Sequence, residues 1–247
     1  IHSGNSIHGD VGLISVKAGS SVENEGGNID MVAGQSEEEN GGKVTISSGG
    51  SRNSLSGSVE ILSASAIGGS GTGDISIGTG STDSGDAGSI GLSGGKSLSG
   101  DGGSINLEGG DSSFGSGGNI EFNAGSSGSN LGGSVVLTSG AGRESSGDIQ
   151  LKTATTGVQS GSISVETGFS ENNDTGNITV KTGSSLNGAA GDIKVAAGEG
   201  IVGGNISLVG GVTTSSSSEG GSVNIKGGES NEGSGCSIIL TGGDRKS

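Results

Sequence analysis

The side chains best suited to catalysis are few in this chain. Its two histidines, His2 and His8, stand near the start, and its one cysteine, Cys236, stands near the other end. Nucleophilic catalysis needs a nucleophile, a base and a group that orients the base, all within hydrogen-bond reach. The spacing assembles no such set. Carbohydrate lyases usually stack their sugar substrates on aromatic side chains, and this chain has only three phenylalanines as aromatic residues. The sequence therefore predicts a protein that is not an enzyme, with no catalytic residues and no cofactor.

Acidic residues are numerous but do not form a metal-binding pattern. Glu37, Glu38 and Glu39 are consecutive, which is typical of a solvated loop tip, and other acidic residues are scattered: Asp74, Asp148 and Asp192. Calcium-binding β-rolls instead repeat a nine-residue phrase with Asp at a fixed place. We expect weak binding of divalent cations at most, and no dedicated metal site.

Two kinds of covalent modification are indicated by residue type. Three Asn-x-Ser/Thr sequons mark candidate N-glycosylation sites at Asn173, Asn177 and Asn205. Cys236 stands where most repeats have glycine, and it is small enough to be a neutral replacement. As an odd cysteine it is also a candidate for an intermolecular disulfide in an oxidising compartment.

The composition excludes several partners. The net charge is −15, whereas nucleic acids and anionic membranes are bound by basic surfaces. No apolar run approaches the roughly 20 residues of a membrane helix. Glycine provides 59 of 247 residues and proline none. Gly/Ser-rich acidic chains are usually disordered, but the strict period described next favours an ordered repeat.

One phrase, represented by residues 102–110 (GGSINLEGG), recurs sixteen times with a usual spacing of 15 residues. Two aliphatic or similarly apolar residues occupy alternate positions, as Ile105 and Leu107 do. We call these the first and second row positions. The first row consists of Ile14, Ile29, Val44, Val59, Ile75, Ile90, Ile105, Ile120, Val135, Ile149, Ile163, Ile178, Ile193, Ile206, Val223 and Ile238. Alternation predicts a strand with Ile105 and Leu107 inside and Asn106 and Glu108 outside.

The fold predicted from this repeat is all-β: a single-stranded parallel β-solenoid, or β-helix, of about sixteen 15-residue coils. Lys152, Glu166 and Lys181 hold the same position in consecutive repeats, so one repeat per coil would stack opposite charges. Residues 1–247 are expected to form one continuous array. The chain starts inside a phrase at Ile1 and stops just after one, which predicts uncapped ends and a segment of a longer chain or filament.

Glycines frame most phrases, two residues before the first row position in fifteen of the sixteen copies and five residues after it in fourteen. They predict corners, made either by positive φ or by close approach of backbones. The residue before the later glycine is always small, which indicates a narrow interior. A Ser or Thr recurs in the connecting loop, and we expect these hydroxyls to hydrogen-bond along the stack. One repeat is short (13 residues) and the next long (17), consistent with a local bulge or a contact loop.

The repeat, as in residues 132–140 (GGSVVLTSG), resembles glycine-rich repeat proteins of algal and related protist cell surfaces, including flagellar hairs (mastigonemes). The resemblance implies an extracellular, fibrous and glycosylated context at the cell surface or on a flagellar appendage. It transfers no functional residue.

The function predicted from these observations is that of a rod-like structural component of an extracellular filament or surface fibre. Its partners would be copies of itself or other filament proteins, with attached glycans. The alternative is a binding module, such as an adhesin-like spacer or an ice-binding solenoid. The outward positions include Ser15, Asp30, Thr45 and Glu60, so they carry no continuous Thr row for ice.

Overall fold

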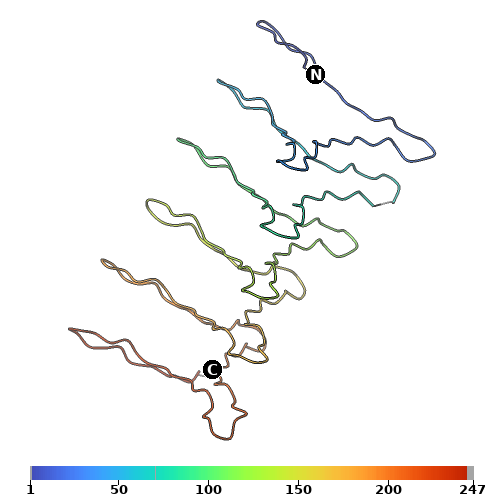
Figure 1. The fold of residues 1–247 in the computed structure, drawn as a ribbon. Helices are drawn as coiled ribbons and strands as arrows, with labels where there is room; N and C mark the ends of the chain where they lie inside the picture. The colour runs from blue at the N-terminus through green and yellow to red at the C-terminus, as the bar shows by residue number, and fades with distance from the viewer. Residues whose placement is uncertain (1, 70, 244–247) are drawn as a thin grey trace. The chain divides into compact units, whose positions relative to one another are not determined.

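The computed structural model describes residues 2–69 and 71–243. These residues contain no helix and no strand; the chain is coil, with a short bend in the repeats, for example at 22–24, 37–39 and 113–115. Figure 1 accordingly shows a continuous ribbon without arrows or coiled segments. Close approaches between Cα atoms mostly join residues fewer than 12 positions apart, which is less than one repeat.

The prediction of an all-β fold, a parallel β-solenoid or β-helix with one repeat per coil, is therefore wrong. A solenoid needs backbone hydrogen bonds that run from each repeat to the next. The backbone hydrogen bonds found outside regular elements instead join glycines across a single loop, such as Gly27 to Gly19. Short, glycine-rich segments have a weak strand preference and a weakly specified register. Alternating row positions thus fix a side-chain period without fixing a pairing partner.

No side chain among the described residues is buried, so the predicted interior is absent. First row positions are 47–58% exposed and second row positions are 57–89% exposed. Ile105 and Leu107, which were expected inside, are 51% and 57% exposed. The two rows still differ consistently, which means that each repeat sets the same local environment. The apolar side chains of this single chain face water.

The backbone contacts divide the chain into two units, Ile1–Gly125 and Ser126–Ser247. Loops whose two ends are joined by a backbone hydrogen bond occur in both units, for example Gly34–Gly42 in the first and Gly228–Cys236 in the second. Continuity of the array over residues 1–247 remains a prediction. The predicted uncapped ends involve Ile1 and residues 244–247, which lie outside the described residues.

Candidate functional site

The recurring local structure is a loop closed by one backbone hydrogen bond. The N–H of the residue two places before a first row position donates to the C=O of the glycine that opened the loop, over 2.8–3.1 Å. We call these the closed loops. Nine are found in the described chain: Gly19–Gly27, Gly34–Gly42, Gly49–Gly57, Gly95–Gly103, Gly110–Gly118, Gly140–Gly147, Gly198–Gly204, Gly211–Gly221 and Gly228–Cys236.

The closed loops absorb the variation in repeat length. The short repeat, Ile193 to Ile206, contains Gly198–Gly204, and the long repeat, Ile206 to Val223, contains Gly211–Gly221. The eight-residue segment between loops, such as Gly27–Gly34, keeps its length. Insertions at loop tips cost little closure entropy. The pair of a short and a long repeat, predicted to be a bulge or a contact loop, is thus a difference in the length of the closed loop, while the segment between loops is unchanged.

A hydroxyl group organises the tip of most connecting loops from within; in Gly140–Gly147 and Gly198–Gly204 a glycine stands at that position. Nine serines accept a hydrogen bond through Oγ from the backbone N–H three residues later, over 2.8–3.2 Å. They are Ser21, Ser36, Ser51, Ser97, Ser112, Ser127, Ser170, Ser185 and Ser230. Thr82, Thr156 and Thr213 accept instead from the N–H two residues later, over 3.1–3.3 Å. Such side-chain turns stabilise a bend locally.

The prediction that these hydroxyls bond along a stack is therefore wrong, although the residues themselves were found correctly. Each hydroxyl satisfies an N–H of its own loop, because no neighbouring coil is there to receive it. The signal for this role was present in the sequence as a fixed distance of two residues from the opening glycine. That distance places the hydroxyl within hydrogen-bond reach of a backbone N–H two or three residues later in the same loop.

The base of most closed loops is sterically narrow, although a Cβ on Gly147 would lie 3.9 Å from its nearest neighbour, the Ser139 Cβ. A Cβ on Gly42 would lie 3.1 Å from the Gly34 nitrogen and 3.2 Å from the Ala33 Cβ. Ala33 is half-buried, as are residues at the equivalent position in four other loops: Gly109, Ser139, Gly210 and Gly227. The recurrent small residue therefore reflects a pinch at the loop base, not a narrow interior shared by stacked coils.

Of the two reasons expected for the framing glycines, close approach applies to the closing glycine of most closed loops, whereas opening glycines such as Gly34 have nothing within 4 Å of an added Cβ. Positive φ occurs, among the described glycines, at Gly4, Gly9, Gly68, Gly69 and Gly85, and four of these lie inside loops. At the loop bases the backbones approach closely instead, as Gly42 does Gly34. Substitution at closing glycines such as Gly42 is therefore limited by space.

Cys236 shows how the base accommodates a side chain. It replaces the closing glycine, and its N–H still donates to the Gly228 C=O over 3.0 Å. The residue facing it is Gly227, and the loops closed by Gly103, Gly118 and Gly221 also have glycine at this position. A Cβ on Gly227 would overlap the Cys236 oxygen, so this position requires glycine. The thiol is exposed, and its role in an intermolecular disulfide stays a prediction.

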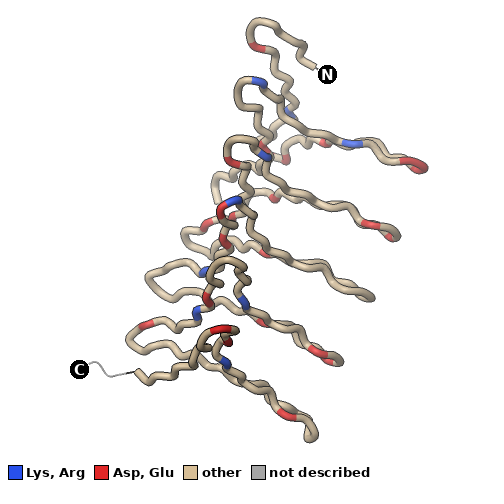
Figure 2. The backbone as a smooth tube through the Cα atoms, turned by 90° about the vertical axis from the view of Figure 1, so that its left-hand side faces the viewer, with Lys and Arg blue, Asp and Glu red and all other residues tan. Residues whose placement is uncertain are grey.

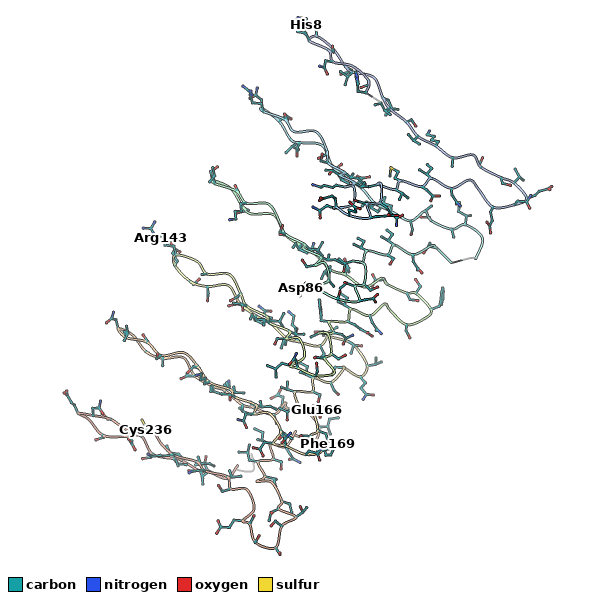
Figure 3. The ribbon with its side chains drawn as sticks, in the orientation of Figure 1. His8, Asp86, Arg143, Glu166, Phe169 and Cys236 are labelled. Atoms are coloured by element: carbon teal, nitrogen blue, oxygen red, sulfur yellow. The ribbon has the colours of Figure 1, made fainter. Side chains whose placement is uncertain are left out.

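The remaining residues considered for chemistry do not converge. Figure 3 shows His8 and Asp86 apart from one another in the first unit. In the second unit Arg143 lies at a loop tip, away from Glu166 and Cys236. No group of three His, Cys, Asp or Glu side chains that could hold a metal ion occurs within the described ranges.

The charges are distributed along the surface. Figure 2 shows acidic residues at several loop tips. The ion pair found in the described part of the chain joins Lys226 Nζ to Glu229 Oε1, three residues apart. The predicted ladder of Lys152, Glu166 and Lys181 forms no such pair there. No ion pair among the described residues joins one repeat to the next.

The three sequons lie at exposed positions of two kinds. Asn173 is at a loop tip, where its N–H donates to Ser170 Oγ over 3.2 Å. Asn177 and Asn205 each directly follow the glycine that ends a connecting loop, next to the first row positions Ile178 and Ile206. All three remain candidate glycosylation sites.

Within residues 2–69 and 71–243, no helix has the length and apolar character needed to cross a bilayer. Comparison of the chain with protein-family models, with curated proteins and with solved structures finds no match.

The hydroxyl turn can be tested at one loop. Ser97 Oγ accepts the Gly100 N–H over 2.8 Å. A single hydrogen bond contributes about 0.5–1.5 kcal/mol net, so Ser97→Ala should speed solvent exchange of the Gly100 amide about two- to tenfold. Amide exchange measured by NMR provides the rate. Ser99→Ala, in the same loop, is the matched control and should leave it unchanged. An unaltered Gly100 rate in Ser97→Ala would contradict the assignment.

Proposed function

We propose that this protein is a non-catalytic structural component of an extracellular filament or surface fibre, built by association with copies of itself or with other filament proteins. The observation that carries the proposal is the repetition of one exposed apolar unit. Each of sixteen repeats presents a first and a second row position at least partly open to water. No single position is distinguished from its equivalents, which suits a repeating assembly better than one ligand site.

Exposed apolar area supplies the driving force for assembly. Removing apolar surface from water contributes about 25 cal/mol per Å². Monomeric soluble proteins rarely leave extended apolar patches uncovered. The first row side chains, of which Ile120 is 48% and Ile163 is 58% exposed, leave a comparable area in every repeat. A second copy of the chain carries the same side chains at the same spacing, so its row positions can cover the exposed row positions of the first copy.

Charge opposes and thereby controls this association. With a net charge of −15, two copies repel one another at low ionic strength. Salt shortens the Debye length to about 8–10 Å at physiological strength and reduces the repulsion. Acidic residues at loop tips, such as Glu37, Glu38 and Glu39, keep the tips hydrated while the rows associate. The proposed fibre thus assembles through its rows and stays soluble through its loops.

The proposed location is the cell exterior, at the cell surface or on a flagellar appendage. The exposed sequons at Asn173, Asn177 and Asn205 and the exposed thiol of Cys236 suit that setting, where glycans and disulfides are added. An intact mass of native material above that of the polypeptide would reveal attached glycans.

Imaging of native material tests the function. Negative-stain electron microscopy of protein isolated without denaturant should show filaments, or lateral and end-to-end contacts between chains. Analytical ultracentrifugation at rising salt should show the same association in solution. Isolated monomers at physiological salt and at the highest workable protein concentration would contradict the proposal.

A further inference from the structure

Two Asn-Gly pairs occur in the chain, Asn40-Gly41 and Asn187-Gly188, and both lie in connecting loops. Asparagine followed by glycine is the pair most open to spontaneous succinimide formation, since glycine has no side chain to obstruct attack. The four residues are exposed. The two pairs therefore share their chemistry and solvent access, and the local hydrogen bonds decide how they differ.

The hydroxyl turn stands in a different register at the two pairs. Ser185 Oγ accepts the N–H of Gly188 over 3.0 Å, and this nitrogen is the one that would attack Asn187. Ser36 Oγ accepts instead from Glu39, over 3.0 Å. The closing bond of that loop uses the Gly42 N–H. Between these two donors, the Gly41 N–H has no hydrogen-bond partner among the described residues.

We propose that Asn40 is a site of self-modification, at which the Gly41 nitrogen converts the side-chain amide to a succinimide, and that Ser185 protects Asn187 from the same reaction. The proposal rests on the loop geometry and does not depend on the proposed function.

The reaction consumes only water. Hydroxide removes the proton from the Gly41 nitrogen, which attacks Cγ of Asn40 and forms a new C–N bond. The Cγ–Nδ2 bond breaks, and the NH2 group takes up one proton from water and leaves as ammonia, which regenerates the hydroxide. Water then opens the imide at either carbonyl, giving aspartate or isoaspartate. No oxidation or reduction occurs, and the loop gains one negative charge beside Glu37, Glu38 and Glu39.

The protection at Asn187 follows from the hydrogen bond that must break. While Ser185 Oγ accepts the Gly188 N–H, the proton of that nitrogen is held in a hydrogen bond and is less accessible to hydroxide. Breaking one hydrogen bond of ordinary net strength slows the attack about two- to tenfold. The neighbouring carboxylates disfavour the amide anion at Gly41, so the comparison belongs in high salt, which screens exposed charges.

The test measures both sites in the full chain. Protein is incubated in mildly alkaline, high-salt buffer, and aspartate plus isoaspartate at each site is followed by peptide mass spectrometry. Asn40 should react faster than Asn187. Ser185→Ala should speed Asn187 about two- to tenfold while Asn40, in the same molecule, keeps its rate. Ser184→Ala, the neighbouring hydroxyl, is the matched control and should change neither.

A parallel incubation in urea separates loop structure from the preceding residues, which are Glu39 at one site and Leu186 at the other. Loss of the turn should bring the Asn187 rate up towards that of Asn40. The proposal is overturned if Ser185→Ala leaves Asn187 unchanged, if Asn187 reacts at least as fast as Asn40 in the folded chain, or if urea preserves the difference.

Discussion

Replacing Ile90, Ile105 and Ile120 by serine is expected to raise the concentration at which this protein assembles by about 100-fold. These first row positions belong to consecutive repeats and are 53%, 51% and 48% exposed. Fully burying an isoleucine contributes about 1.5–3 kcal/mol, and roughly half of that remains available at each position. Three positions together therefore supply about 3 kcal/mol. Light scattering against protein concentration gives the assembly threshold.

The matched control replaces three apolar residues of the connecting loops by serine: Leu98, Phe114 and Leu131. They are 107%, 104% and 95% exposed, so they offer more apolar area than the row positions. Their place in the loop varies from repeat to repeat, so they do not form a regular surface. If assembly depended on exposed apolar area in general, the three loop substitutions would raise the assembly concentration at least as much as the three row substitutions. That result, or an unchanged threshold with the three row substitutions, would contradict association through the rows.

The repeat itself could be predicted from sequence because its signals are local. Most closed loops are marked by a small residue before the loop, by a glycine at each end and by a Ser or Thr two residues after the opening glycine. All of these residues act within about ten positions of one another, as in Gly34–Gly42 with Ser36. Short-range backbone geometry and steric size suffice to relate them. The hydroxyl residues were therefore identified correctly even though their partners were not.

The arrangement between repeats could not be predicted in the same way. Alternation at Ile105 and Leu107 says which side chains share a face but not what covers that face. The same pattern suits a neighbouring repeat of the same chain and a second chain equally well. Sixteen near-identical repeats make these pairings close in energy, and glycine lowers the preference for a ladder. The structure of a single chain leaves the rows open.

The steric pinch at the loop base leads to the second large effect, at Gly42. In Gly42→Ala the new Cβ would lie 3.1 Å from the Gly34 nitrogen, 3.2 Å from the Ala33 Cβ and 3.3 Å from the Gly34 oxygen. Overpacking of this kind costs about 1–3 kcal/mol. The closing hydrogen bond contributes only about 0.5–1.5 kcal/mol. The loop should therefore open, and the amide of residue 42 should exchange at the rate of an unstructured alanine in NMR measurements.

Gly34→Ala is the control from the same closing bond. A Cβ there meets nothing within 4 Å, and Gly34 is not among the described glycines with positive φ. Alanine at a compatible position restricts the open chain and stabilises the closed loop by about 0.4–1 kcal/mol. The two substitutions should thus act in opposite directions, and equal effects would contradict the pinch.

The opening glycine, rather than Ala33, sets most of the pinch. In the loops closed by Gly103, Gly118 and Gly221 the facing residue is glycine, yet a Cβ on the closing glycine would lie 2.8–3.0 Å from the nitrogen of the opening glycine. Ala33→Gly combined with Gly42→Ala should therefore leave the loop open, because the new Cβ keeps its 3.1 Å approach to the Gly34 nitrogen. The added glycine flexibility costs about a further 0.5–1 kcal/mol. A double-mutant cycle on the residue-42 exchange rate should give effects that add within about 0.5 kcal/mol. Recovery of amide protection in the double variant would mean that the Ala33 side chain, and not the Gly34 backbone, limits the space.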